Sequence, residues 1–189
     1  MKTVVFMLEE PSMEMVLLGI LPRLLPATVH PICIRHQGKR DLELSLTRKL
    51  RSWSDRKVTF VILGDQHSED CLRMKRRLKA ICRKAGRPDA IIRIVCPELE
   101  AWLLGDLDAV AKAFDLPRIA ALKGKRKYSE PDLLANAAQE LRGIVPDYQK
   151  IGGARAVAPL LSLEKNRSQS FQLFVRTVRS IASAASPLA

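Results

Sequence analysis

Val58-Thr-Phe-Val-Ile-Leu63, followed directly by Gly64 and Asp65, is the stretch that decides the fold. An uninterrupted run of β-branched and apolar residues is typical of a strand buried on both faces of a parallel sheet. Ligands of open α/β sheets bind outside the carboxyl ends of the strands, which is where Asp65 would stand. The stretch therefore predicts a parallel sheet with an acidic group at its functional edge.

Three further runs extend this pattern in both directions along the chain. Thr3-Val-Val-Phe-Met-Leu8 ends in Glu9 and Glu10, and Ala90-Ile-Ile-Arg-Ile-Val95 precedes Glu98 and Glu100. A strand over 28–34 contains Pro31, which suits a sheet edge. Apolar residues at helical spacing separate the runs, and they predict helices over 11–24 (ended or kinked by Pro22), 42–53 and 68–85 (capped by Ser68). The resulting β-α-β-α-β-α-β order predicts an α/β fold: about four strands, mainly parallel, with helices on both faces.

The second half of the chain is helical in pattern. After a short helix over 99–104, we expect helices at 107–114, 132–144, 152–162 and 169–184, a mobile basic loop at 118–130 and a hinge at Gly152-Gly153. Ser168 or Ser170 would cap the last of these helices. We therefore expect an α/β core over residues 1–105 and a C-terminal helical extension over 106–189 packed on it.

The charge is strongly positive and unevenly distributed. The net charge is +12 and the pI is about 10.0. Between Cys71 and Pro88 all charged residues are basic: Arg73, Lys75, Arg76, Arg77, Lys79, Arg83, Lys84 and Arg87. A second basic patch comprises Lys123, Lys125, Arg126 and Lys127. A solvated surface would explain the charge, but surfaces of that kind usually mix signs, so a polyanionic partner is favoured, with nucleic acid ahead of membrane.

Composition excludes several other classes. Aromatic residues make up 5% of the chain, too few for a platform that stacks single-stranded bases. Four cysteines without a CxxC pair disfavour a zinc site, and three of them have apolar neighbours typical of small buried residues. Without an apolar run of membrane length or a leader pattern, we expect a cytoplasmic protein in a reducing compartment. The absence of a P-loop pattern predicts no nucleotide hydrolysis by this chain.

Acidic residues near the predicted strand ends are the candidate catalytic and metal-binding groups. Glu9 and Asp65 are the main candidates, and the remaining candidate metal ligands are His67, Asp70, Glu98 and Glu100. Carboxylates gathered in a basic protein favour a divalent cation, because the cation offsets their mutual repulsion. Simpler roles stay open, since Asp70 could stabilise a helix start. If the stretch around Glu98 and Glu100 is already helical, at most one of the two can face the ion, because residues two apart on a helix do not share a face.

A phosphate-binding turn is the remaining candidate. His36-Gln-Gly-Lys39 could hold an anion through backbone N–H groups and the Lys39 ammonium. Lys39, Arg73, Arg76 and Arg77 together with the second basic patch are therefore the candidate nucleic-acid-binding residues.

Five motifs together resemble the bacterial family called domain of unknown function 4276. They are Leu8-Glu-Glu-Pro-Ser12, His36-Gln-Gly-Lys39, Gly64-Asp-Gln-His-Ser-Glu-Asp-Cys71, Pro97-Glu-Leu-Glu-Ala-Trp102 with Gly105-Asp106, and Asn166-Arg-Ser-Gln-Ser-Phe171. That family is regarded as Toprim-like and related to the nuclease domains of OLD (overcoming lysogenization defect) proteins. The resemblance implies a Rossmann-like sheet with a glutamate after the first strand and a DxD motif after the third, which bind Mg²⁺ for phosphodiester chemistry.

The resemblance also implies roles for individual residues and a partner. Glu9 matches the glutamate and Asp65 the first aspartate, whereas His67 stands at the second aspartate of the DxD motif. Histidine suits Mn²⁺ better than Mg²⁺, and Asp70 and Glu100 are the candidates to supply the missing oxygen. Proteins of this kind are often encoded beside an AAA or ABC-type ATPase, in modules that resemble anti-phage defence.

Three functions are therefore open. The first is a metal-dependent nuclease centred on Glu9 and Asp65. The second is a catalytically degenerate module that binds nucleic acid or an ATPase partner, which His67 favours. The third is an inhibitor or assembly factor whose basic face docks on an acidic protein.

Overall fold

The computed structural model describes residues 2–185, and these contain a four-stranded, all-parallel sheet. The strands lie in the order β2-β1-β3-β4, with bounds Val29–Arg35, Lys2–Leu8, Thr59–Asp65 and Ile91–Val95. The continuous apolar runs form the two central strands, and the strand that contains Pro31 lies at an edge, as expected. The predicted α/β class is confirmed, and the arrangement is consistent with a Toprim/Rossmann-like fold.

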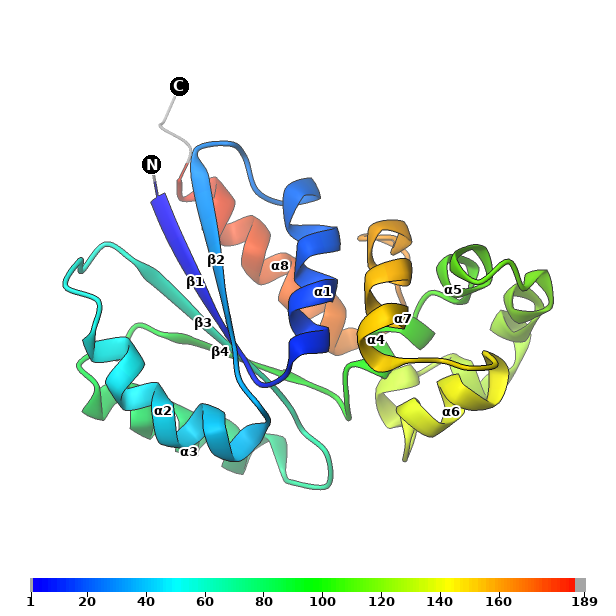
Figure 1. Cartoon of the computed structure of the whole chain (residues 1–189), viewed down its shortest axis with the longest axis horizontal. Helices are drawn as coiled ribbons and strands as arrows, with labels where there is room; N and C mark the ends of the chain where they lie inside the picture. Colours follow the sequence, from blue (N-terminus) through cyan, green and yellow to red (C-terminus); the bar gives the residue numbers. More distant parts are fainter. Residues whose placement is uncertain (1, 186–189) are drawn as a thin grey trace.

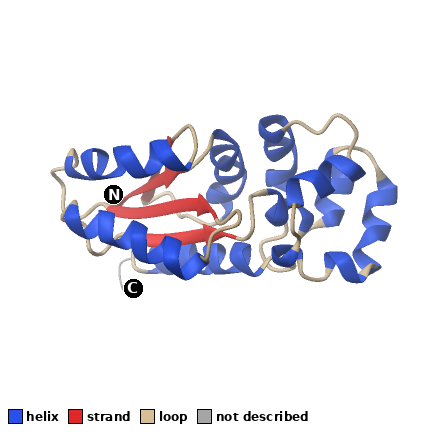
Figure 2. Ribbon diagram, turned by 90° about the horizontal axis from the view of Figure 1, so that it is seen from below, coloured by secondary structure: helices blue, strands red, loops and turns tan. Residues whose placement is uncertain are grey.

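Helices cover both faces of the sheet (Figures 1 and 2). Successive side chains of β1 point to opposite faces of the sheet, and each set packs against its own layer of helices. Val5 and Met7 belong to one core with residues of α2 (Lys39–Arg51) and α3 (Cys71–Lys84). Val4, Phe6 and Leu8 belong to the other core, with residues of α1 (Pro11–Ile20) and α8 (Gln169–Ser183). The rings of Phe6 and Phe174 lie 6.2 Å apart, so the last described helix packs directly on the sheet.

A lobe of short helices stands beyond the carboxyl ends of the strands (Figure 2). It contains α4 (Glu100–Leu104), α5 (Leu107–Ala113), α6 (Ala137–Ile144) and α7 (Lys150–Val157). Five 3₁₀ turns complete the helical elements of residues 2–185: η1 (Leu21–Arg23), η2 (Pro117–Gly124), η3 (Arg126–Tyr128), η4 (Pro131–Leu133) and η5 (Ala158–Leu160). The carboxyl edge of the sheet therefore faces this lobe, while the domain boundary at residue 105 stays a prediction.

Capping residues correct two of the predicted helix starts. The helix expected over 68–85 begins at Cys71, because Asp70 rather than Ser68 accepts a hydrogen bond from the backbone N–H of Arg73. The helix expected over 132–144 begins at Ala137, because Asn136 caps it. Ser168 caps α8 as expected.

Two segments that we expected to be flexible form helical structure. The basic loop 118–130 forms η2 and η3, and the buried side chains of Ile119 and Tyr128 anchor it. Gly152 and Gly153 lie inside α7 rather than at a hinge, and α7 ends before Pro159, short of the predicted residue 162.

The expected burial of the cysteines and the expected lack of a membrane-spanning segment can be compared directly with the structure. Of the four cysteines, Cys82 is fully buried, whereas Cys33, Cys71 and Cys96 are half-buried free thiols. Within residues 2–185, every helix is too short or too polar to cross a membrane.

Candidate functional site

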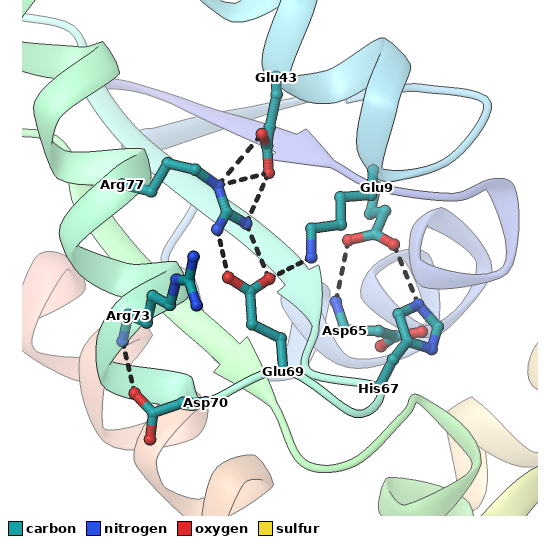
Figure 3. Close-up of polar contacts among 9 residues, drawn as sticks. Glu9, Glu43, Asp65, His67, Glu69, Asp70, Arg73 and Arg77 are labelled. Carbon is teal, nitrogen blue, oxygen red and sulfur yellow. Dashed lines mark hydrogen bonds and ion pairs between the residues drawn. The ribbon is translucent and has the colours of Figure 1, made fainter.

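Glu9 and Asp65 meet at the carboxyl edge of the sheet (Figure 3). Glu9 follows β1 and Asp65 ends β3, and these strands are hydrogen-bonded neighbours. One Glu9 oxygen, Oε2, accepts a hydrogen bond from the backbone N–H of Asp65 at 3.1 Å. The other, Oε1, lies 3.3 Å from His67 Nε2. The parallel pairing thus brings together two acidic residues that lie 56 positions apart in the sequence.

The Asp65 side chain is buried without a partner. Its relative exposure is 0%, and among residues 2–185 neither carboxylate oxygen has a hydrogen-bond donor. Burial raises the pKa of Asp65 well above its usual value, and the charges of Glu10 and Glu9 raise it further. Unpartnered buried carboxylate oxygens are costly, so the arrangement needs an explanation other than stability.

Glu100 is a second buried acidic group beside this pair. It opens α4 at 0% exposure, and its Oε1 atom accepts a hydrogen bond from the hydroxyl of Tyr148 at 3.4 Å. Its Oε2 atom has no partner in the described part of the chain. Burial raises the pKa of Glu100, although the Lys150 charge opposes the shift.

Lys150 brings a positive charge into the cluster. Its Nζ atom donates to both carboxylate oxygens of Glu10, at 3.0 and 2.9 Å, and lies 4.0 Å from Glu100 Oε1. Burial alone would lower the pKa of Lys150, but the Glu10 hydrogen bond and the neighbouring acidic charges outweigh it, so the pKa is raised. We name Glu9, Glu10, Asp65, Glu100 and Lys150 the acidic centre.

Sequence reasoning missed part of this centre. From the sequence, no role in this centre is assigned to Tyr148 or Lys150, and Glu10 is not among the predicted ligands. The available signal was Gly153: a Cβ atom there would lie 2.1 Å from Tyr148 Cε2, so the glycine lets the tyrosine ring pass toward Glu100.

Gly64 has a similar positional role on β3. A Cβ atom at this residue would lie 2.8 Å from Glu9 Oε2 and 2.8 Å from the Met74 Cε atom. The glycine therefore allows the Glu9 carboxylate to reach across the strand to Asp65. The sequence marked Gly64 only as the end of a strand.

Two of the predicted ligands lie outside the centre. Asp70 accepts a hydrogen bond from the Arg73 N–H at 2.7 Å as the cap of α3 and is directed away from Asp65 (Figure 3). Glu98 accepts a hydrogen bond from the Ala138 N–H at 2.7 Å. His67 does reach the centre through Glu9, from a backbone with φ of 52° and a side chain that is 49% exposed.

The motifs near the end of the chain are structural. Asn166 donates a hydrogen bond to the carbonyl of Trp102 at 2.7 Å and packs on Gly105, where a Cβ atom would lie 2.1 Å from its Oδ1 atom. The buried Trp102 indole donates to Ser170 Oγ at 2.8 Å. These contacts join the helical lobe to α8, and they account for the motifs without assigning them chemistry.

A family model described as Domain of unknown function (DUF4276) matches residues 8–179. The chain belongs to this family. Each of the five motifs lies within the matched DUF4276 region. No curated protein and no solved structure matches the chain.

The predicted nucleic-acid-binding residues of this DUF4276 protein fall into two groups: a first group whose charges are paired with acidic side chains, and a second group without such a pair. Lys39 and Arg77 pair with Glu69, and Arg77 also pairs with Glu43 (Figure 3). On the second patch, Lys123 pairs with Asp108 and Lys127 with Glu140. Of the eight predicted residues, the second group is exposed and has no ion pair to residues 2–185: Arg73, Arg76, Lys125 and Arg126. The second group therefore offers the charge that a phosphate backbone could neutralise.

The acidic centre of this DUF4276 protein fits a hard divalent cation by donor type. Carboxylate oxygens are the ligands that Mg²⁺ prefers, and Asp65 and Glu100 hold three such atoms without partners among the described residues. Across residues 2–185, no three His, Cys, Asp or Glu side chains are already arranged as a ligand set. A complete set would therefore require movement of side chains, with Glu10 exchanging its Lys150 contact for the ion.

Proposed function

We propose that this DUF4276 protein is a divalent-metal-dependent phosphodiesterase that acts on nucleic acid. The observation that carries the proposal is the buried Asp65 carboxylate, which lacks partners for both oxygens and lies among Glu9, Glu10 and Glu100. Buried, destabilised carboxylates at the carboxyl edge of a parallel sheet are typical of functional sites.

Each residue of the acidic centre has a role in this proposal. Asp65 and Glu9 hold the ion, with Glu10 and Glu100 as further oxygen donors. The ion is Mg²⁺, with Mn²⁺ as the alternative that His67 would accept more readily. When bound, the ion supplies a Lewis acid for the phosphodiester. The Lys150 ammonium, released from Glu10, is placed to bind a phosphoryl oxygen.

The surface charge supports nucleic acid as the substrate. The net charge is +12, and Arg73 and Arg76 are exposed on α3, the helix that follows the Asp65 loop. Phosphate contacts by exposed arginines give affinity without sequence preference, which suits either DNA or RNA. An AAA or ABC-type ATPase partner and a role in anti-phage defence belong to the same proposal and rest on the family resemblance. A cytoplasmic location belongs to it as well and rests on the composition of the chain.

A cleavage assay with a matched pair of variants tests the proposal. Asp65→Asn removes one charge from the centre, and Asp70→Asn makes the same chemical change at a helix cap that asparagine also serves. With Mg²⁺ or Mn²⁺ supplied, we expect nucleic-acid cleavage by wild type and by Asp70→Asn, and at least a hundredfold loss in Asp65→Asn while nucleic-acid binding survives. Equal cleavage by all three proteins would contradict the proposal.

A catalytically degenerate binding subunit is the second candidate. Two observations favour it: His67 stands where an aspartate would complete DxD, and Lys150 already supplies a positive charge to Glu10 and Glu100. This function predicts salt-sensitive nucleic-acid or partner binding with no turnover, with Mg²⁺ or Mn²⁺ and with or without the ATPase. Activity that appears only in a His67→Asp variant would also support it.

A further inference from the structure

Two thiols that lie 25 residues apart in the sequence meet at the edge of the sheet. Cys71 is the first residue of α3, and Cys96 follows β4 directly. Their Sγ atoms are 3.4 Å apart, a hydrogen bond between two free thiols in which either sulfur can be the donor. The acidic centre does not use either sulfur.

The backbone on either side holds this pair together. The Gln66 N–H donates to the Val95 carbonyl at 2.9 Å, and the His67 N–H donates to the Pro97 carbonyl at 2.8 Å. Asp65 and Val95 are also register partners in the β3–β4 ladder. The segments before Cys71 and around Cys96 are thus already joined, so closing the remaining gap between the two sulfurs requires only a small movement.

The pair is open to small reagents. Both cysteines line a cavity of about 360 Å³ between the start of α3, the edge strand β4 and α8, together with Leu72 and Leu173, whose side chains are exposed. The other two cysteines lack this combination, since Cys82 is fully buried and Cys33 lies on β2 at the opposite edge of the sheet.

We propose that Cys71 and Cys96 form a reversible intramolecular disulfide, a modification site that responds to low-molecular-weight disulfides such as oxidised glutathione. The Cys71 thiolate attacks the reagent, forms a mixed disulfide and releases one reduced thiol. The Cys96 thiolate then attacks Cys71 Sγ and displaces the second reduced thiol. The net reaction transfers two electrons and two protons from the protein to the reagent, which balances the formation of one S–S bond.

The environment of Cys96 explains this order of attack. Burial raises the pKa of Cys96 to about 12, and the hydrogen bond and charge of Cys71 add to the effect. Cys96 is therefore a poor first nucleophile. Once Cys71 carries the mixed disulfide it has no thiolate charge and no S–H group, so these two contributions disappear and Cys96 becomes easier to ionise.

The disulfide would tie the start of α3 to the end of β4 across the loop that carries His67. It would fix this loop covalently beside Asp65, in addition to the two backbone hydrogen bonds. The inference does not depend on the proposed phosphodiesterase activity, because it concerns only the two sulfurs and their surroundings.

Thiol counting and mass spectrometry on the full chain test the inference. Native protein is incubated with oxidised glutathione, and free thiols are then counted after unfolding. We expect wild type to fall from four thiols to two, to lose the mass of two hydrogens, and to yield one peptide linking Cys71 to Cys96 that a reductant releases. The Cys33→Ser variant is the control, because it removes a half-buried thiol that lies outside the pair. It should fall from three thiols to one by forming the same linkage.

Two further variants separate the steps. Cys96→Ser should accumulate a glutathione adduct on Cys71, because the resolving thiol is gone, and Cys71→Ser should form neither adduct nor linkage. Four free thiols in oxidised wild type, a stable adduct on wild-type Cys71, or a linkage that persists in Cys71→Ser would each overturn the inference.

Discussion

At the scale of single residues, the buried Asp65 carboxylate has no hydrogen-bond donor for either oxygen among the described residues. A buried carboxylate without hydrogen-bond donors costs about 1–3 kcal/mol, more if it stays charged. We therefore expect Asp65→Asn to raise the free energy of unfolding by about 1–3 kcal/mol at neutral pH, because the amide can donate to the neighbouring carboxylates. Thermal or urea unfolding measures this, and Asp70→Asn should leave stability unchanged. A destabilised Asp65→Asn protein would contradict the account.

The same residue predicts a pH dependence. The pKa of folded Asp65 is raised well above 3.8, so the folded state binds more protons than the unfolded chain above that pH. Asp65 therefore contributes a decrease in the free energy of unfolding as pH rises from 3.8 through the raised pKa. Since Asp65→Asn lacks this loss, its advantage over wild type should grow with pH in parallel unfolding experiments. A constant difference across the range would show that Asp65 titrates normally.

Lys150 predicts a coupling between residues. It pairs with Glu10, lies near Glu100 and is only 32% exposed, so Lys150→Met should destabilise the protein by about 2 kcal/mol at neutral pH. In an Asp65→Asn background one acidic charge is already gone, so the same change should cost less. Urea unfolding of wild type, the two single variants and the double variant measures the difference. Equal costs of Lys150→Met in both backgrounds would show that Lys150 and Asp65 are not coupled.

At the scale of elements, adjacent glycines of α7 differ in what surrounds them. Gly152 is open, because the nearest atom to an added Cβ is Gln149 Cβ at 3.9 Å. Gly152→Ala should stabilise α7 by about 0.5–1 kcal/mol. Gly153→Ala should cost about 1–3 kcal/mol, because its methyl group would lie 2.1 Å from the Tyr148 ring and displace the contact with Glu100. Unfolding of the two variants measures this, and equal effects would argue against the Tyr148 packing.

Strands and caps explain which elements could be predicted from sequence. The runs before Asp65 and Glu9 are continuous and apolar, so their burial and parallel pairing followed from pattern alone. Helix starts were less predictable, because Ser68 and Asp70 are both good caps and only the three-dimensional path of the chain selects Asp70. The loop 118–130 was predicted to be mobile because most of its residues are polar or basic, and no periodic pattern indicates that Ile119 and Tyr128 are buried.

Of the candidate site, the residues at the strand ends could be predicted from the sequence, and the residues from the helical lobe could not. Glu9 and Asp65 converge because neighbouring parallel strands end at one edge. Glu100, Tyr148 and Lys150 come from the helical lobe, and no sequence pattern states how that lobe docks on the sheet. The packing of Tyr148 over Gly153 is a long-range fit that a helical periodicity cannot reveal.

At the scale of the whole molecule, the net charge of +12 predicts salt-dependent binding to nucleic acid. Arg76→Ala on α3 should weaken binding similarly for all sequences and reduce the slope of log affinity against log salt by about 1. Arg179→Ala is the matched control, because Arg179 is exposed on α8, at the opposite face of the sheet, and pairs with Glu164. Binding titrations at several salt concentrations measure the slopes, and identical losses in both variants would indicate a diffuse charge effect instead of a surface on α3.

The central claim is that the acidic centre binds a divalent cation through Asp65. Anomalous diffraction from crystals soaked in Mn²⁺ tests it most directly. The account predicts a peak within coordination distance of Asp65 and Glu9, with Lys150 withdrawn from Glu10, and no such peak in Asp65→Asn crystals. An unchanged contact between Lys150 and Glu10 in wild-type crystals, with no manganese peak beside Asp65, would contradict it.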